Sequence, residues 1–242
     1  MKTIIITGAS GGIGSAIACS LADKNTNLVL TYNHNKKSID ELKNKLSTKC
    51  NILVCKCDLT NEEQIEKMVN SAINKFNKID TLINCAGISQ FKQIQDISMQ
   101  DYNRIMQNNF LSTLLAIKFV SKNMISNQNG KIINISSMWG VVGASMESLY
   151  SASKGAINTL TLSLAKELGP SNITVNAVCP GLIDTKMNKS LSTEDKQAII
   201  DSTPLCKIGK PEDVANLVKF LASEKANFIT GQIITIDGGL TL

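Results

Sequence analysis

Short apolar runs alternate with longer amphipathic segments over almost the whole chain. The runs are rich in β-branched residues and are continuously apolar, which is typical of parallel strands that are buried on both faces. The segments between them have helical periodicity, so the pattern predicts β–α–β crossovers and a doubly wound sheet. We expect strands at residues 3–7, 27–32, 51–56, 80–84, 131–136, 173–178 and 232–237, and helices near residues 13–24, 36–48, 61–77, 99–126, 150–169 and 211–223.

No linker, repeat or change of composition divides the 242 residues, so a single domain over residues 1–242 is expected. The predicted fold is α/β, of the doubly wound Rossmann type, with a seven-stranded parallel sheet and helices on both faces. The most irregular stretch, residues 182–208, follows a strand and contains a capping-box pattern at residues 192–195. Because it is too long for an ordinary connection, we interpret it as a substrate lid.

Composition argues against several classes of protein. The net charge is +5, but 24 of the 25 basic residues are dispersed lysines, so no nucleic-acid surface is expected. No run reaches the roughly 18 apolar residues of a membrane helix, and the apolar start is too short for a signal peptide, so a cytoplasmic protein without a membrane span is expected. The seven cysteines include no CxxC pair, so neither a disulfide framework nor a metal site is expected.

A glycine-rich stretch, TGASGGIG at residues 7–14, follows the first predicted strand and opens the first predicted helix. Glycines let a chain turn tightly and approach a phosphate without a clash, and a helix N-terminus presents free N–H groups to it. The stretch therefore predicts a dinucleotide-binding turn.

Tyr150 and Lys154 lie four residues apart on a predicted helix, hence on one face, whereas the only histidine, His34, is far away in a polar stretch. A free phenol has a pKa of about 10. A lysine cation about 4 Å away, at an effective dielectric of about 20, stabilises the phenolate by about 4 kcal/mol. This would lower the pKa of the phenol by about three units. We therefore expect Lys154 to lower the pKa of Tyr150 and Tyr150 to transfer the proton.

The glycine spacing Gly8-xxx-Gly12-x-Gly14, together with Tyr150-xxx-Lys154, resembles the short-chain dehydrogenase/reductase family over essentially the whole chain. Asn109, Ser137, Tyr150 and Lys154 are similar to the catalytic tetrad of that family in identity and order. The resemblance implies hydride transfer to a carbonyl carbon, with Tyr150 protonating the oxygen and Ser137 orienting it. It also implies that Lys154 holds the nicotinamide ribose and that Asn109 anchors a water that relays protons.

The same resemblance implies a nicotinamide cofactor. Asp58 in CDLT is similar to the aspartate that meets the adenine ring, NCAG at residues 84–87 is similar to the family's NNAG with Cys85 departing from it, and CPGLIDT at residues 179–185 is similar to its PG motif. The implied cofactor-binding residues are Gly8, Ser10, Gly12, Ile13, Gly14, Asn33, Asp58, Leu59, Asn84, Ala86, Gly87, Tyr150, Lys154, Pro180, Gly181, Ile183 and Thr185.

The end of the second strand bears on the choice of cofactor. An acidic residue there would bind the ribose 2′-OH and repel a 2′-phosphate. The stretch LVLTYNHNKK has none, and Lys36 and Lys37 follow it, so NADPH is favoured over NADH. Against this, Gly11 stands where many NADPH-dependent relatives have an arginine.

Three functions stay open. The tail ITGQIITIDGGL and the strand GKIINIS resemble the beta-ketoacyl-acyl-carrier-protein reductases, which act in fatty-acid synthesis. Acyl carrier protein is acidic, so docking would need basic residues beside the active site; Lys131 is expected to be one, whereas Ser171 and Asn172 occupy the place of another. The third function is a non-catalytic nucleotide-binding regulator on the same fold.

The second function is suggested by INISSMWGVVGAS and GISQF, which resemble a subgroup that reduces the 5-aminopentanone group on a lysine of elongation factor P. Glu147 could meet the amine of such a substrate, and Gln90 is a second candidate on the substrate side. The family resemblance also implies a homotetramer built on the helices near residues 99–126 and 150–169.

Overall fold

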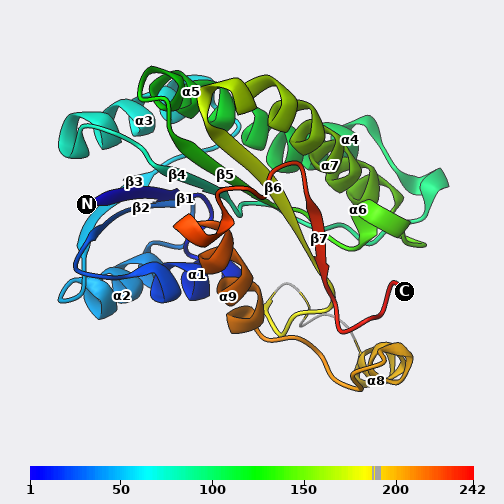
Figure 1. Ribbon diagram of the computed structural model, residues 1–242. Coiled ribbons are helices and arrows are strands. Elements are labelled where there is room, and N and C mark those ends of the chain that lie inside the picture. Colours follow the sequence, from blue (N-terminus) through cyan, green and yellow to red (C-terminus); the bar gives the residue numbers. More distant parts are fainter. Residues whose placement is uncertain (187, 189–191) are drawn as a thin grey trace.

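The computed structural model describes residues 1–186, 188 and 192–242, and these contain a seven-stranded sheet (Figure 1). The strand order is β3-β2-β1-β4-β5-β6-β7, and all neighbouring strands are parallel. Every predicted strand is confirmed, with bounds that differ from expectation by at most two residues. The strands are β1 (Lys2–Ile6), β2 (Thr26–Tyr32), β3 (Asn51–Lys56), β4 (Thr81–Asn84), β5 (Gly130–Ile135), β6 (Ile173–Pro180) and β7 (Ile233–Ile236).

Helices cover both faces of the sheet, as predicted (Figure 1). One face carries α1 (Gly12–Leu21), α2 (Lys36–Leu46) and α9 (Pro211–Leu221), and the other carries α3 (Glu62–Phe76), α5 (Ser112–Ser126) and α7 (Ser148–Leu168). Three further helices lie toward one end of the sheet, on the right in Figure 1: α4 (Met99–Met106), α6 (Trp139–Val142) and α8 (Thr193–Ser202). None of the described helices is both long and apolar enough to cross a bilayer.

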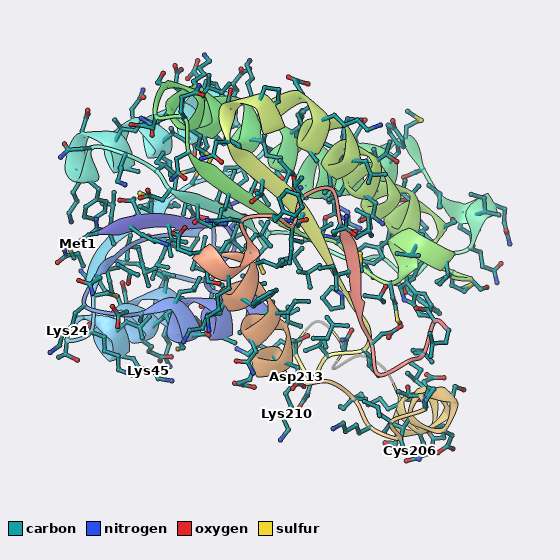
Figure 2. All side chains as sticks on the ribbon, viewed as in Figure 1. Met1, Lys24, Lys45, Cys206, Lys210 and Asp213 are labelled. Carbon is teal, nitrogen blue, oxygen red and sulfur yellow. The ribbon has the colours of Figure 1, made fainter. Side chains whose placement is uncertain are left out.

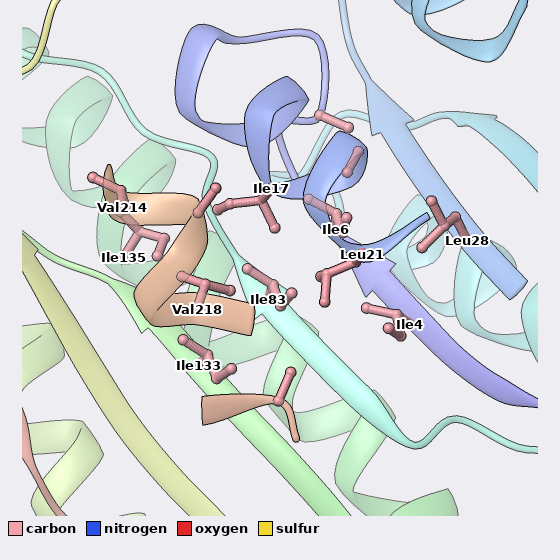
Figure 3. Close-up of a cluster of buried hydrophobic side chains, with 14 of the residues drawn as sticks. Ile4, Ile6, Ile17, Leu21, Leu28, Ile83, Ile133, Ile135, Val214 and Val218 are labelled. Atoms are coloured by element: carbon pink, nitrogen blue, oxygen red, sulfur yellow. The ribbon is translucent and has the colours of Figure 1, made fainter. Parts of the chain in front are cut away.

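The two apolar cores explain why the strands are continuously hydrophobic. Successive residues of a strand point to opposite faces. Ile4 and Ile6 of β1 accordingly pack with α1 and α9 on one face (Figure 3), whereas Ile5 packs with α3 and α5 on the other. All three isoleucines are at most 3% exposed, and burying each stabilises the fold by roughly 1.5–3 kcal/mol.

The helical segment predicted near residues 99–126 is confirmed, but it is not α-helical throughout. A π-helical segment, η2 (Gln107–Leu111), separates α4 from α5. The hydroxyls of Ser112 and Thr113 donate to carbonyl oxygens one turn earlier, at 2.6 and 2.9 Å. Such a segment admits an extra residue and is frequent at functional sites. Here it holds Asn109 inside the protein, with 0% exposure.

The winding of the chain reverses between β1 and β4, which are neighbours in the sheet. Ligands of doubly wound sheets bind at this point, beside the carboxyl ends of the strands. The glycine-rich turn, the NCAG segment, Ser137 and the PG segment follow β1, β4, β5 and β6, so the fold brings all of them to this edge.

The predicted lid is fixed at its base. Ile183 pairs with Gly209, and Ser192 caps α8 by accepting a hydrogen bond from the Asp195 N–H at 3.0 Å. No described residue of α8 is buried, and Figure 2 shows Cys206, near its end, away from the body of the sheet. Residues 187 and 189–191 of the predicted lid lie outside the described residues.

Candidate active site

The glycine-rich turn lies directly against the NCAG segment. Gly8 has a φ of +65°, and a Cβ on it would lie 2.8 Å from the Cα of Ala86. A Cβ on Gly14 would lie 2.4 Å from the carbonyl oxygen of Gly8. Only glycine fits at these two positions.

Two threonines that sequence reasoning missed hold this turn. The Thr7 hydroxyl accepts hydrogen bonds from the N–H groups of Cys85 and Ala86 at 3.0 and 3.2 Å. The Thr31 hydroxyl accepts one from the Gly8 N–H at 3.2 Å. Thr7 belongs to the TGASGGIG stretch, but nothing in the local sequence of Thr31 indicates this role.

The N-terminus of α1 fits a pyrophosphate. Its N-cap is Gly11, which has no side chain to occupy the free N–H groups, and Ser10 and Ile13 beside it are partly exposed. A Cβ on Gly12 would lie 3.0 Å from the methyl carbon of Thr185, so the segment after the PG motif lies over the turn. An anion in this place would be stabilised by the N–H groups and the helix dipole.

The PG segment is tightly packed. Pro180 ends β6, and a Cβ on Gly181 would lie 2.6 Å from the Cβ of Asp237. Ile183 is 3% exposed, and a Cβ on Gly209 would lie 2.5 Å from its Cδ1. The backbone of this segment is therefore rigidly placed beside the glycine-rich turn.

The residues predicted to meet the adenosine lie at the ends of β2 and β3. The Cys57 N–H donates to the Tyr32 carbonyl at 2.9 Å and so joins these two ends. Asp58 accepts from the N–H and hydroxyl of Thr60 at 2.9 and 2.8 Å, which fixes its carboxylate. Leu59 packs against the core, and Asn33 is partly exposed beyond the end of β2.

Asn84 lies in the sheet, with 3% exposure. Its amide donates to Asn134 at 2.9 Å, and the amide of Asn134 donates to Thr161 at 2.9 Å, so the chain of bonds joins β4, β5 and α7. Its own side-chain oxygen is buried and has no partner among the described residues. The contacts described for Asn84 are thus structural, and its role toward a cofactor stays a prediction.

Asn109 is held by three side-chain hydrogen bonds. Its amide donates to the carbonyl of Ile88 and to the hydroxyl of Ser153, both at 2.9 Å, and its oxygen accepts from the Ile88 N–H at 2.8 Å. A Cβ on Gly87 would lie 3.3 Å from both the Asn109 oxygen and the Lys154 nitrogen. The structure therefore brings together three of the predicted site residues, namely Gly87, Asn109 and Lys154.

Tyr150, Ser137 and Lys154 meet beside this point. The Lys154 ammonium is 5.8 Å from the centre of the Tyr150 ring and donates to the Ile135 carbonyl at 2.9 Å. The Ser136 hydroxyl donates to the Lys154 carbonyl at 3.1 Å, which fixes α7 against the end of β5. Lys154 and Ser137 are 4% and 7% exposed.

The expectation that Lys154 lowers the pKa of Tyr150 is wrong for this state of the protein. Burial raises the pKa of Tyr150 to about 12; a hydrogen bond with Ser137 acts against the rise and the Glu147 carboxylate adds to it. Burial also lowers the pKa of Lys154 to about 8. Loss of hydration has a larger effect on both groups than the Coulomb attraction between them.

The two substrate-side candidates lie on adjoining loops, because the Lys92 N–H donates to the Met146 carbonyl at 2.6 Å. Glu147 is half-buried at the start of α7. Burial raises its pKa, and an interaction with the Trp139 side chain lowers it in part. The Gln90 amide donates to Asp101 at 2.6 Å, so it is already held by the protein.

Lys131 does not lie at the mouth of the site, contrary to expectation. It is near the start of β5, whereas the site is at the carboxyl ends of the strands. Its ammonium donates to Asn227 at 2.7 Å, and burial lowers its pKa. Within one chain, Lys131 is therefore unable to guide an acidic partner to Tyr150.

A surface hollow of about 820 Å³ lies near the amino ends of β1, β2 and β3, where Lys43, Lys75 and Lys78 line it. None of the predicted site residues lines this hollow. Among the described residues, no group of three or more acidic, histidine or cysteine side chains could hold a metal ion.

Comparisons with known proteins agree with this geometry. Residues 8–241 match the family model described as "Enoyl-(Acyl carrier protein) reductase". The chain is 39% identical over 240 residues to "Uncharacterized oxidoreductase YmfI" of Bacillus subtilis, covering 98% of both chains. It is 38% identical over 242 residues to "3-oxoacyl-[acyl-carrier-protein] reductase FabG" of Aquifex aeolicus, covering 99% of this chain and 97% of the relative.

Among solved structures, a double mutant of a Serratia marcescens short-chain dehydrogenase/reductase superposes with a TM-score of 0.94 at 30% identity, covering 100% of this chain and 98% of that one. Fold and site thus define a nicotinamide-dependent oxidoreductase of the doubly wound class. The chain belongs to the short-chain dehydrogenase/reductase family. A non-catalytic regulator, the third function considered, does not fit relatives that are named reductases and oxidoreductases.

If Tyr150 is the proton donor, replacing it with Phe should lower turnover of a ketone at least about a hundred-fold, because the ring stays and only the hydroxyl is lost. Steady-state kinetics measure turnover, and fluorescence titration should show unchanged NADPH binding. Tyr102→Phe is the matched control, since Tyr102 is exposed on α4. Retention of more than about a tenth of the activity would exclude Tyr150 as the proton donor.

The reductive activity should fall as the pH rises through about 8, because Lys154 is a cation only below its pKa of about 8. The measured quantity is kcat/KM for NADPH, which reports groups of the free enzyme. In Lys154→Arg the falling limb should move to higher pH, because a guanidinium stays charged. A wild-type profile that is flat to about pH 10 would contradict the assignment.

Proposed function

We propose that this oxidoreductase reduces a ketone to a secondary alcohol with NADPH, and that Tyr150 donates the proton. The observation that carries the proposal is the meeting of Tyr150, Ser137 and Lys154 beside Gly87, at the edge of the sheet where the glycine-rich turn also lies. When bound, the reduced nicotinamide would supply the hydride for the carbonyl carbon.

The residues divide the remaining chemistry between them. With a pKa of about 12, Tyr150 is protonated at neutral pH, which is the form that a proton donor needs. Ser137 bonds to the phenol and would orient the substrate oxygen beside it. Lys154 would hold the nicotinamide ribose, and its cation would stabilise the phenolate left after proton transfer. Asn109 would take part in proton relay. The described hydrogen bonds of its side chain are to Ile88 and Ser153.

The residues that would hold NADPH are those of the uncapped α1 N-terminus, Asp58 and the PG segment. Lys36 and Lys37 are exposed in the first turn of α2, and this first turn contains no acidic residue. Cations at a helix N-terminus are unfavourable for the helix on its own, and a phosphate would reverse this effect. This arrangement supports NADPH over NADH.

NADPH should therefore be used more efficiently than NADH, and Lys36→Ala combined with Lys37→Ala should narrow the difference about ten-fold. The control is Lys43→Ala with Lys45→Ala, in the last turn of the same helix. The ratio of kcat/KM for the two cofactors is the readout. Equal efficiency of both cofactors in the unmodified enzyme would refute the preference.

A 3-oxoacyl thioester on acyl carrier protein is the first candidate substrate. It is supported by relatives at 33–38% identity that carry the name 3-oxoacyl-[acyl-carrier-protein] reductase. Residues 182–208 would act as a lid over the acyl chain. The active form would be a homotetramer, and Leu162 on α7 is an exposed apolar residue that could lie in its interface.

An amino ketone is the second candidate, with the 5-aminopentanone group of elongation factor P as the instance suggested by the sequence. Glu147 supports it, because the carboxylate is half-buried beside Tyr150 and forms no ion pair among the described residues. Such a carboxylate gains from a substrate ammonium.

Glu147→Gln should separate the two candidates. If the substrate carries an ammonium, kcat/KM should fall about ten- to a hundred-fold for the amino ketone and change little for a neutral ketone. NADPH oxidation with an acetoacetyl thioester and with elongation factor P bearing the aminopentanone supplies both measurements. A large loss with the neutral ketone would mean that Glu147 supports α7, and the argument for an amino ketone would then fail.

A further inference from the structure

The segment 88–92, between β4 and α4, is attached to the protein at three places. Its first residue, Ile88, is bonded through both its N–H and its carbonyl to Asn109. Its last, Lys92, donates its backbone N–H to the Met146 carbonyl at 2.6 Å. The third attachment is to Asp101 in the first turn of α4. Asp101 is not among the predicted site residues.

Asp101 accepts more hydrogen bonds than a helix cap requires. A capping box needs only the return bond to the N-cap, here Ser98, at 2.9 Å. Asp101 also accepts from the Gln90 amide at 2.6 Å and from the Lys92 ammonium at 2.7 Å. The hydrogen bond from Lys92, followed by those from Ser98 and Gln90, holds the pKa of Asp101 well below its usual range, so the carboxylate is charged at neutral pH.

The conformation that these bonds hold is unfavourable by itself. The side-chain oxygen of Gln90 is buried without a partner among the described residues, because its amide group is directed to Asp101. Met146 has a φ of +64°, in the left-handed region that side chains other than glycine avoid. Each feature costs free energy, so the surrounding contacts must impose it, and such strain concentrates at functional sites.

We propose that Asp101 is a positioning residue for the substrate end of the active site. It clamps Gln90 and Lys92 to α4, and through the bond from Lys92 to Met146 it fixes the loop that carries Glu147. Glu147 precedes Tyr150 by about one turn of α7, so the placement of this loop relative to the phenol depends on the clamp. The proposal rests on the function proposed above for the same site.

Asp101→Asn tests the clamp, since it keeps the shape of the side chain and removes its charge. The KM for the ketone should rise about ten-fold while kcat and NADPH affinity change less than about two-fold. Hydrogen exchange should become faster in residues 88–92 and 143–147. The control, Ser98→Ala, weakens the cap of α4 but leaves the hydrogen bonds that Gln90 and Lys92 donate to Asp101, so it should lower thermal stability without raising KM.

An unchanged KM in Asp101→Asn, or an equal rise in Ser98→Ala, would reduce Asp101 to a helix cap and overturn the proposal. Unchanged exchange in the two loops would overturn it as well. The exchange measurement needs no substrate, so it decides the positioning role even if the enzyme reduces none of the ketones offered. Failure of the proposed function and failure of the clamp are thus distinguishable.

Discussion

The carboxamide of Asn109 holds together three parts of the chain that are distant in sequence. It bonds to the backbone of Ile88 after β4 and to Ser153 on α7, while its own backbone lies in the π-helical segment. The Ser153 hydroxyl in turn donates to the Tyr150 carbonyl at 2.7 Å. One buried amide therefore links the helix that carries the phenol to the NCAG segment, and it lies in a π-helical turn, a feature that is frequent at functional sites.

Burial sets the proton chemistry of the site. Loss of water destabilises the phenolate of Tyr150 and the ammonium of Lys154, so the pKa of the first is raised and that of the second is lowered. A simple attractive pair would shift each pKa in the opposite direction, lowering that of the phenol and raising that of the ammonium. A site of this kind keeps a proton on the phenol until a further charge enters it, which suits the role of proton donor proposed for Tyr150.

The strands could be predicted because their signals are local, whereas most candidate site residues were assigned through the family resemblance. Residues of β1 are apolar on both faces, and the spacing of Tyr150 and Lys154 fixes one helical face. The π-helical segment around Asn109 could not be predicted, because the hydrogen bonds of Asn109 are made with Ile88, which lies far away in sequence. The same holds for Thr31 and Asp101, whose roles come from partners that only the fold brings near.

Strand direction explains the wrong placement of Lys131 and bears on the choice of substrate. Lys131 and Ser137 are close in sequence, but they lie at opposite ends of β5, so only the second reaches the site. Near the site, the Lys92 ammonium is paired with Asp101, whereas Glu147 forms no ion pair among the described residues. Glu147 is thus a carboxylate free to pair with a substrate cation, whereas the Lys154 ammonium already lies 5.8 Å from the centre of the Tyr150 ring. A free carboxylate favours a ketone that carries a cation, and an acidic carrier would have to dock through cations that lie farther from the phenol.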